Sequence, residues 1–327
     1  MNKFDVLFTA DSKYIVIMLS SIFSFIKNSK LENIRVHLIT KDFTKEDYKM
    51  VEEFINNLNA ECYFYPLENF DIEKYNIPKW REGQIPNSRL FFEEIIKPHI
   101  LNIKKILYLD CDTITVSDLT ELKNYKNSLM ACRDICCLKR YYENLYNLDT
   151  YYNSGVLYID VDDWTKNNNQ ERIIKFIENN NIKLSYPDQD IINCVLSNEI
   201  KELPIKYNLP PHAYMFNDFF GKLYFNSKYR NTAYNETKGA IINPKIIHSY
   251  GILKPWDGSY NPYHKEYMKY ILEVDPNFKV EELSKFKKIL SKYPDLYPAM
   301  ILTRTYIPEK IETKIKKLIK SEYSKTK

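Results

Sequence analysis

Two carboxylates separated by one residue follow a short apolar run in the stretch ILYLDCDTIT, residues 106–115. The run Lys105–Leu109 is partly β-branched and has no helical periodicity, which predicts a buried strand. Asp110 and Asp112 would then lie at its carboxyl end, on one side of an extended chain. Like charges that close resist ionisation unless a cation lies between them. The spacing indicates a site for magnesium, manganese or calcium, although a solvated loop would carry the same two acids.

Two residues later in the chain could complete such a site. His248 follows an apolar triplet and precedes a glycine turn, so its imidazole could give a third metal contact. An imidazole beside carboxylates favours manganese over calcium. Lys254 could place an ammonium beside a phosphate and stabilise a leaving diphosphate. Taken singly, these residues are better explained as a structural histidine and a surface lysine.

Two other segments place polar side chains at the ends of predicted elements. Thr9, Ala10 and Asp11 end the first predicted strand, where an α/β fold presents its first ligand-binding loop. Asp11 would serve equally well as the N-cap of the following helix. Asp188 and Asp190 flank an amide at the start of another predicted helix. Helix capping explains one of these acids, whereas the pair with its amide is typical of a site for a polyhydroxyl compound.

Composition excludes several classes of protein. The chain has 327 residues and six glycines, and neither a G-x-G-x-x-G fingerprint nor a P-loop can be written with them. Six cysteines without paired C-x-x-C spacing predict free thiols in a reducing compartment and no zinc site. Of the net charge of +4, residues 281–327 hold +6, so the remainder is slightly acidic. The basic part lacks interleaved aromatic residues, so nucleic-acid binding is not expected.

The elements that must position these residues alternate between strand and helix, as in an α/β protein. We expect strands at residues 5–9, 35–40, 61–66, 105–109, 156–159 and 245–248, and helices at 14–27, 44–58, 89–98, 169–179 and 188–196. Pro98 should close the helix that starts at Arg89, and Asn153–Gly155 should form a turn. The longest apolar stretch, residues 14–26, is too short to cross a bilayer, and the N-terminus does not resemble a signal peptide.

Six segments occur in an informative order: FTADSKY, SRLFF, YLDCDT, YYNSGVLYID, YPDQDIIN and IHSYGILKPW. Their order and intervals resemble the family 8 glycosyltransferases over about residues 4–257. These are retaining enzymes that use UDP-sugars, and they include bacterial lipopolysaccharide galactosyl- and glucosyltransferases and the glycogenins. The resemblance implies a GT-A fold, which is a Rossmann-like nucleotide-binding α/β domain with a mixed central sheet. It also implies transfer of galactose or glucose from a UDP-sugar to a glycan or lipooligosaccharide, with Mn²⁺ or Mg²⁺.

The resemblance assigns roles residue by residue. Asp110, Asp112 and His248 match the metal ligands. The matches to the nucleotide-sugar site are Thr9, Ala10, Asp11, Tyr14, Arg89, Asp110, Cys111, Asp112, Asn153, Asp188, Gln189, Gly251 and Lys254. The predicted catalytic residues are Arg89, Asp188, Gln189 and Asp190, with Gln189 at the β face of the anomeric carbon. No carboxylate matches a covalent nucleophile, so the resemblance favours a front-face mechanism with an oxocarbenium-like transition state and retention. Lys13 and Asp257 depart from the asparagine and histidine that are common at these positions.

A change of pattern near Pro262 predicts a domain boundary. Residues 1–262 would form the GT-A catalytic domain, and residues 263–327 a lysine-rich helical tail. In residues 310–320 the apolar side chains share one helical face among lysines, as in interfacial helices and also in ordinary packed helices. We expect a cytoplasmic enzyme whose tail docks on anionic lipid at the inner face of the membrane.

Two other functions remain open at this point. A haloacid dehalogenase-type phosphohydrolase also carries D-x-D after an apolar strand, with the first acid as phosphoryl acceptor. Its motif normally opens the domain, however, and no downstream acidic pair completes a magnesium site here. A catalytically silent sugar-nucleotide-binding module would keep the same fold. Residues 132–150 and 212–235 are the expected acceptor loops, but they specify neither the acceptor nor the choice between galactose and glucose.

Overall fold

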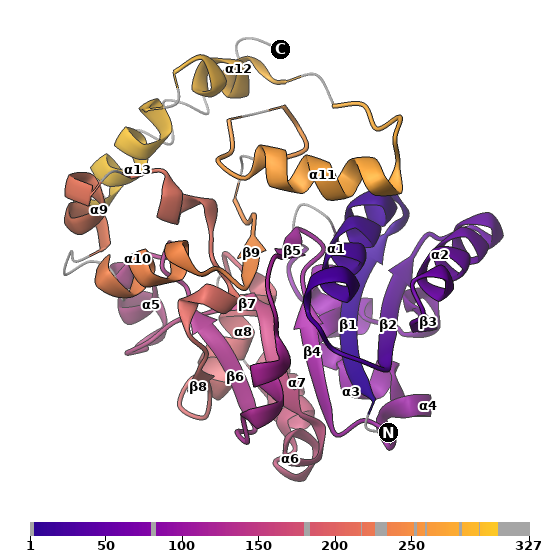
Figure 1. Ribbon diagram of the computed structural model, residues 1–327. Helices are drawn as coiled ribbons and strands as arrows, with labels where there is room; N and C mark the ends of the chain where they lie inside the picture. Colours follow the sequence, from indigo (N-terminus) through magenta and orange to yellow (C-terminus); the bar gives the residue numbers. More distant parts are fainter. Residues whose placement is uncertain are drawn as a thin grey trace.

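The computed structural model describes residues 3–79, 83–179, 184–216, 218–225, 234–251, 254–258, 260–280, 283–293 and 295–306. Within these residues, the central sheet has seven strands in the order β3-β2-β1-β4-β7-β6-β8 (Figure 1). The strands are β1 Phe4–Asp11, β2 Ile34–Lys41, β3 Glu61–Pro66, β4 Lys105–Leu109, β6 Leu129–Arg133, β7 Tyr152–Asp160 and β8 Lys201–Glu202. A second, two-stranded sheet pairs β5 Thr113–Thr115 with β9 Ile246–His248.

The central sheet is mixed, as predicted. Strand β1 pairs in parallel with β2 and β4, and β2 pairs in parallel with β3. Strand β7 runs antiparallel to both β4 and β6. The alternation of strands and helices therefore predicted the parallel half of the sheet, whereas β5, β6 and β8 were not predicted.

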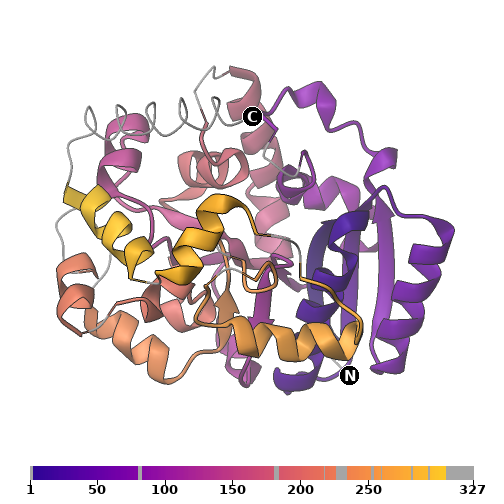
Figure 2. The ribbon, with the colours of Figure 1, turned by 90° about the horizontal axis from the view of Figure 1, so that it is seen from above.

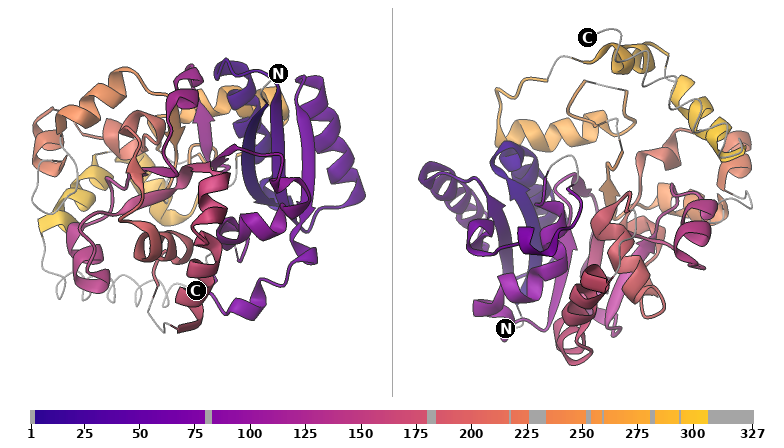
Figure 3. Two further views of the ribbon diagram at one scale, coloured as in Figure 1. Left: turned by 90° about the horizontal axis from the view of Figure 1, so that it is seen from below. Right: turned by 180° about the vertical axis from the view of Figure 1, so that it is seen from behind.

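Helices cover both faces of this sheet (Figure 3). Helices α1 Ile15–Asn28, α2 Lys45–Asn57 and α11 His264–Val274 lie on one face, and α3 Phe92–Ile95, α6 Val161–Lys166, α7 Asn169–Asn179 and α8 Pro187–Leu196 lie on the other. Successive side chains of β1 enter opposite layers, since Val6 and Phe8 pack with α1 and Leu7 packs in the second cluster. Because alternate side chains of β1 point into two buried layers, nearly every position of this strand is apolar.

Helix α4 Lys97–Ile100 precedes β4 and lies near the amino ends of the strands, beside the N-terminus (Figure 1). The remaining helices lie toward the carboxyl ends of the strands, and they are α5 Lys139–Tyr146, α9 Asp218–Phe225, α10 Tyr234–Ile242, α12 Lys285–Lys292 and α13 Leu296–Tyr306. Helices α5 and α9 fall in the regions that were predicted as acceptor loops, and α10 begins at the end of the second region. Seen from above, α12 and α13 lie over the upper end of the molecule (Figure 2).

Two local predictions were wrong. The helix expected at residues 89–98 is divided into a 3-10 helix Pro86–Phe91 and the short helices α3 and α4. Pro98 lies in the first turn of α4, where its missing N–H costs no hydrogen bond, so it starts a helix instead of closing one. The segment Asn153–Gly155 is part of β7, not a turn, because the Gly155 carbonyl accepts from the Asp110 amide at 2.9 Å.

The region beyond residue 262 begins with a helix that packs on the central domain. In α11, Tyr267, Tyr270 and Ile271 are buried, and the Tyr270 hydroxyl accepts from the Asn28 side chain of α1 at 2.8 Å. The amphipathic helix predicted at residues 310–320 lies outside the described residues. None of the helices described is long and apolar enough to cross a membrane.

Candidate active site

A cavity of about 450 Å³ opens at the carboxyl ends of β1 and β4. Ligands bind at this edge of α/β sheets because several loops converge there. All of the predicted site residues except Asp190 line it, namely Thr9, Ala10, Asp11, Tyr14, Arg89, Asp110, Cys111, Asp112, Asn153, Asp188, Gln189, His248, Gly251 and Lys254. The fold therefore gathers segments nearly 250 residues apart in sequence around one space.

Asp110 and Asp112 converge, although not through the extended geometry that we predicted. Strand β4 ends at Leu109, and the chain then turns, with the Thr113 amide donating to the Asp110 carbonyl at 3.1 Å. The Thr113 hydroxyl donates to the same carbonyl at 2.7 Å. A tight turn, not strand alternation, thus points both carboxylates at one place.

His248 joins the two acids because of the register between β5 and β9. Thr113 of β5 pairs directly with His248 of β9, so the histidine lies beside the residue that follows Asp112. The Ser249 amide donates to the Asp112 carbonyl at 2.8 Å and continues the pairing. Ligand atoms of Asp110, Asp112 and His248 all lie within 4.8 Å of one another.

The imidazole of His248 presents a nitrogen that suits a metal ion. Nε2 lies 2.9 Å from Asp112 Oδ1 and 3.5 Å from Asp110 Oδ2. It is buried, yet it makes no hydrogen bond within the described part of the chain. A buried polar atom in that position, facing two carboxylates, fits a divalent cation that would take all three ligands.

The side chain of Asn208 determines which nitrogen of the His248 ring carries the proton. His248 Nδ1 lies 2.8 Å from Asn208 Oδ1, and the Asn208 amide nitrogen donates to Asn153 Oδ1 at 2.8 Å. The Asn208 oxygen therefore accepts the Nδ1 proton, which leaves a lone pair on Nε2. Partners of this kind fix the ring orientation and the tautomer of a metal-binding histidine.

Gly155 gives the acids and the histidine the space to meet. A Cβ atom built on this glycine would lie 2.1 Å from His248 Cε1 and 2.5 Å from Asp110 Oδ2. Real Cβ atoms do not approach other heavy atoms so closely, so another residue here would displace both side chains. Glycine is therefore needed at position 155 because His248 and Asp110 pack closely against its main chain, and not because the segment forms a turn.

Lys254 forms an ion pair with the metal-site acid. Its Nζ lies 2.5 Å from Asp112 Oδ2 and donates to the Ser249 carbonyl at 3.0 Å. Burial alone would raise the pKa of Asp112, but the ammonium charge of Lys254 lowers that pKa well below its usual range. Asp112 is therefore anionic across the physiological range and available to a cation.

Arg89 links the acid pair to the α8 acids. Its Nη2 lies 2.8 Å from Asp110 Oδ1, and its Nε lies 3.2 Å from Asp188 Oδ2. The guanidinium also stacks 4.5 Å from the ring centroid of Tyr108. Burial would lower the pKa of Arg89, but Asp110 and Asp188 raise it above its usual value, so the guanidinium stays charged.

Gln189 has its amide orientation fixed by neighbours. Its Oε1 accepts from Asn153 Nδ2 at 3.0 Å and from the Ser154 amide at 3.1 Å. Its Nε2 donates to Asp134 Oδ2 at 3.0 Å. Asp188 beside it accepts from the Ser154 hydroxyl at 2.8 Å. Polar groups of Asp188 and Gln189 are thus held in place in the lining of the cavity, where they could bind hydroxyls.

Asp190 points away from the cavity into a cage of hydroxyl and amide donors. Its carboxylate accepts from the hydroxyls of Tyr141, Tyr146 and Tyr151. The amides of Ser185 and Tyr186 donate to it at 2.8 and 2.9 Å. Burial raises the pKa of Asp190 even though these hydrogen bonds act in the opposite direction. In this arrangement Asp190 joins α5 to the start of α8.

The loop after β1 shows both of the roles weighed for Asp11. Its Oδ1 accepts from the Lys13 amide at 3.0 Å, so it caps the following turn and also lines the cavity. The Cys111 thiol donates to the Thr9 carbonyl at 3.2 Å, and burial raises the pKa of this thiol. None of the six cysteines forms a disulfide, as predicted. The buried Cys111 thiol therefore acts as a packing residue and not as a nucleophile.

Several cavity residues were not predicted from the sequence. They are Ile85, Pro86, Asp134, Cys136, Cys137, Ser154, Tyr186, His212, Tyr250 and Tyr297. Asp134 had a usable signal, because it follows the short apolar run Leu129–Arg133 as Asp110 follows β4. Asn208 and Tyr297 had none, since both come from irregular or lysine-rich stretches that long-range packing brings to the site.

The model of glycosyl transferase family 8 matches residues 5–259 of the chain. The chain belongs to glycosyltransferase family 8. This confirms the predicted family and the predicted enzyme class, a sugar-transferring enzyme. The phosphohydrolase alternative is not supported.

This family 8 chain is similar in sequence or structure to several bacterial proteins. It is 28% identical over 216 residues to a protein of Haemophilus influenzae, an alignment that spans 63% of each chain and so less than two thirds of that relative. It is 27% identical over 284 residues to a lipopolysaccharide 1,2-glucosyltransferase of Escherichia coli, covering 84% of this chain and 79% of that one. The galactosyltransferase LgtC, solved with donor and acceptor sugar analogs, superposes with a TM-score of 0.68 at 20% identity over 87% of this chain and 99% of its own. The GT-A fold is thereby confirmed.

Proposed function

We propose that this chain is a manganese-dependent, retaining hexosyltransferase that moves galactose or glucose from a UDP-sugar to a glycan. The observation that carries the proposal is the buried Nε2 of His248, which faces Asp110 and Asp112 without a hydrogen-bond partner in the described chain. Two carboxylates and one imidazole form a donor set that suits Mn²⁺ better than Ca²⁺, with Mg²⁺ as the alternative.

The cavity would hold the donor from its nucleotide end to its sugar end. Thr9, Ala10, Asp11 and Tyr14 would bind the uridine, with the Cys111 segment beneath it. A bound divalent ion would hold the diphosphate and neutralise the charge that develops on it as it leaves. Lys254 and the Gly251 backbone would contact the same diphosphate, because both line the cavity beside the acids.

The hexose would lie between Arg89, Asn153, Asp188 and Gln189. Two hydrogen bonds accepted by Gln189 Oε1 and one donated by its Nε2 fix the orientation of this amide, which would face the β side of the anomeric carbon. Asp188 and Arg89 would bind the sugar hydroxyls and keep its ring oriented. We infer a front-face transfer with retention, in which the departing diphosphate and the incoming hydroxyl share one face of an oxocarbenium-like sugar.

The acceptor would enter beside the hexose, over Asp134, Cys136 and His212. These residues come from the two segments in which acceptor loops were expected, and they line the part of the cavity beyond Gln189. The name of the Escherichia coli relative, a lipopolysaccharide 1,2-glucosyltransferase, supports a bacterial surface glycan or lipooligosaccharide as the acceptor class. A cytoplasmic enzyme would meet such an acceptor at the inner face of the membrane.

The experiment that tests this function measures UDP release from a panel of UDP-hexoses with and without Mn²⁺. Slow hydrolysis of one UDP-hexose that requires Mn²⁺ would support the proposal and identify the donor. Cleavage of generic phosphate monoesters by the purified chain would instead indicate a phosphohydrolase. UDP binding without any turnover would indicate a catalytically silent module.

We further propose that the basic C-terminal region docks on anionic lipid. The predicted helix of residues 310–320 rests on the sequence alone, but α12 exposes Lys285, Lys288 and Lys292 together with Ile289, 48% exposed, and Tyr293, 54% exposed. Basic side chains around apolar ones favour an anionic interface. Deleting residues 281–327 should weaken binding to phosphatidylserine-containing vesicles, and unchanged binding would contradict the idea.

The division of the chain at residue 262 stays a proposal. A catalytic domain of residues 1–262 would have to fold and bind UDP alone, although α11 packs on α1 and Tyr297 of α13 lines the cavity. Expression of residues 1–262 followed by UDP titration would decide whether the remainder is an appendage.

A further inference from the structure

Helices α12 and α13 pass above the cavity, and we call these two helices the C-terminal arch. Figures 1 and 2 both show them over the upper end of the sheet. Tyr297 of α13 lines the cavity, and a Cβ atom built on Gly251 would lie 4.0 Å from its hydroxyl. The ring centroid of Tyr297 also lies 5.9 Å from that of His212. The arch therefore reaches the space in which the donor would bind.

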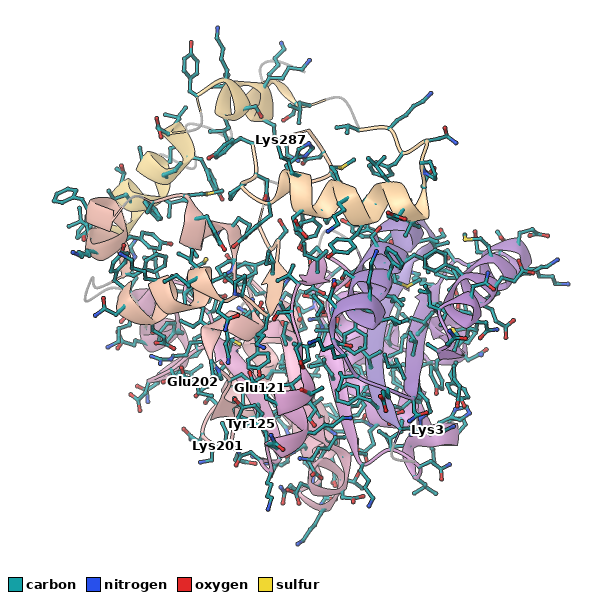
Figure 4. The ribbon with its side chains drawn as sticks, in the orientation of Figure 1. Lys3, Glu121, Tyr125, Lys201, Glu202 and Lys287 are labelled. Carbon is teal, nitrogen blue, oxygen red and sulfur yellow. The ribbon has the colours of Figure 1, made fainter. Side chains whose placement is uncertain are left out.

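One end of the arch is attached to the turn that carries Lys254. Lys287 of α12 forms an ion pair with Asp257, and the Lys287 side chain lies on the inner side of α12 in Figure 4. Side-chain exposure is 28% for Lys287 and 12% for Asp257, so the pair is largely removed from water. The Tyr260 amide also donates to the Ser291 hydroxyl of α12 at 2.9 Å.

Asp257 and Lys254 belong to one compact turn. The Asp257 amide donates to the Lys254 carbonyl at 3.4 Å, and Lys254 Nζ lies 5.7 Å from the ring centroid of Trp256 between them. Trp256 packs against Tyr267 of α11. Gly258, which ends the turn with a φ of +70°, leaves room for Val280, since a Cβ atom there would lie 2.8 Å from Val280 Cγ1. A contact that fixes Asp257 therefore also restrains the main chain of Lys254.

The other end of the arch is attached to α9. The Tyr306 hydroxyl donates to the Leu223 carbonyl at 2.6 Å. Ile301 and Leu302 pack against a cluster that includes Tyr224 and Phe225. Because both ends are attached to different parts of the body, the arch spans the cavity and is not a free appendage.

We propose that the C-terminal arch completes the donor site, with Lys287 as a positioning residue that holds Asp257 and thereby sets Lys254 in place for the diphosphate. This rests on the proposed function, in which Lys254 contacts the diphosphate. Lys287 has a second effect through charge: it neutralises Asp257, whose carboxylate would otherwise repel an anionic diphosphate bound at Lys254 in the same turn. Lys287 touches neither the nucleotide nor the reacting atoms in this scheme.

The test is calorimetric titration of UDP into the full chain at saturating Mn²⁺. We expect Lys287→Ala to weaken UDP binding roughly tenfold, because the turn that carries Lys254 loses its ion pair with α12. Lys287→Arg, which keeps the charge, should bind within about twofold of wild type on the same scale. Lys285→Ala removes an equal charge from an exposed position of the same helix and serves as the matched control.

A second titration, of Mn²⁺ alone, separates positioning from folding. If Lys287 acts on the turn, Lys287→Ala binds Mn²⁺ as wild type does while its UDP affinity falls. Combining Asp257→Lys with Lys287→Asp should then recover part of the lost UDP affinity. Parallel loss of Mn²⁺ and UDP binding would overturn the inference, because the arch would then serve the fold alone.

The remaining outcomes also decide the matter. Wild-type UDP affinity in Lys287→Ala would overturn the inference and leave the proposed function intact. Failure of the wild-type chain to bind UDP with Mn²⁺ would instead overturn the proposed function, and the inference with it. If Lys285→Ala and Lys287→Ala lost the same amount of UDP affinity, the cause would be the overall charge of α12. That result would also contradict the specific role of Lys287.

Discussion

At the scale of residues, the site depends on how closely three side chains approach one another. The acids Asp110 and Asp112 were recognisable in the sequence because a D-x-D after a short apolar run is a local pattern. His248 was recognisable by its place after a strand. Asn208, which fixes the tautomer of His248, was not, because its contact with the ring joins residues 40 positions apart in an irregular segment.

Gly155 offers a direct test of this close approach. Gly155→Ala places a methyl group 2.1 Å from His248 Cε1 and 2.5 Å from Asp110 Oδ2, so both side chains must shift, and the imidazole must shift further. We expect roughly a hundredfold loss of Mn²⁺-dependent UDP release, the size of effect that such misplacement produces. Gly239→Ala in α10 is the matched control, because a Cβ atom there meets nothing within 4 Å. Equal activity of the two variants would contradict the proposed geometry.

At the scale of elements, the start of α8 has two functions on neighbouring residues. Asp188 and Gln189 face the cavity, whereas Asp190 is enclosed by tyrosine hydroxyls from α5 and by that of Tyr151, which comes just before β7. The sequence predicted that two acids and one amide, Asp188, Asp190 and Gln189, lie at the start of a helix. Helical geometry alone could not tell which of these side chains faces the ligand. That depends on α5, an element that was not predicted.

Asp190→Asn distinguishes a structural carboxylate from a catalytic one. The new amide nitrogen would face donors such as the Ser185 and Tyr186 amides, so hydrogen bonds to a charge are lost. We expect the free energy of unfolding to fall by about 2 kcal/mol in urea titrations, with kcat within about tenfold of wild type. Asp149→Ala, at an exposed position, is the control. A loss of kcat of four orders of magnitude in a fully stable variant would identify Asp190 as a reacting group instead.

A second prediction at this scale concerns the pH dependence of the β1–β2–β3 edge. His37 is completely buried, with Nε2 2.8 Å from Asp5 Oδ1 and Nδ1 2.9 Å from the Tyr65 hydroxyl, and Arg35 and His99 lie around the same network. Burial lowers the pKa of His37 below its ordinary 6.5, and the hydrogen bond to Asp5 opposes this only in part.

The sign of the effect follows from the lowered pKa. Below pH 6.5 the unfolded chain takes up a proton that the folded His37 does not, so the stability is complete above this pH and is lost as the pH falls. The slope contributed by this one proton is at most about 1.4 kcal/mol per pH unit. Urea titrations between pH 7.5 and 5.5 should show it in the wild type and a smaller slope in His37→Gln. Identical slopes would show that His37 does not carry the effect.

At the scale of the whole molecule, the sequence predicted the α/β body better than its surroundings. Strands β1, β2, β3 and β4 could be predicted because each is an apolar run between helices. The alternation of strands and helices along the chain also predicts their parallel pairing. The C-terminal arch lies where prolines and lysines predicted a separate tail. Its contacts, Lys287 with Asp257 and Tyr306 with Leu223, join residues far apart in sequence, and no periodicity within either segment reveals them.

The measurement that tests the whole account most directly is UDP release from UDP-galactose and UDP-glucose by the wild type and Asp112→Ala, each with and without Mn²⁺. Asp149→Ala is the control for loss of one acidic charge. The account predicts Mn²⁺-dependent release from one donor by the wild type and the control, and at least a hundredfold less by Asp112→Ala, because the developing diphosphate charge loses about 3 kcal/mol of stabilisation. Release that is independent of Mn²⁺, or equal in wild type and Asp112→Ala, would contradict a metal site at Asp110, Asp112 and His248.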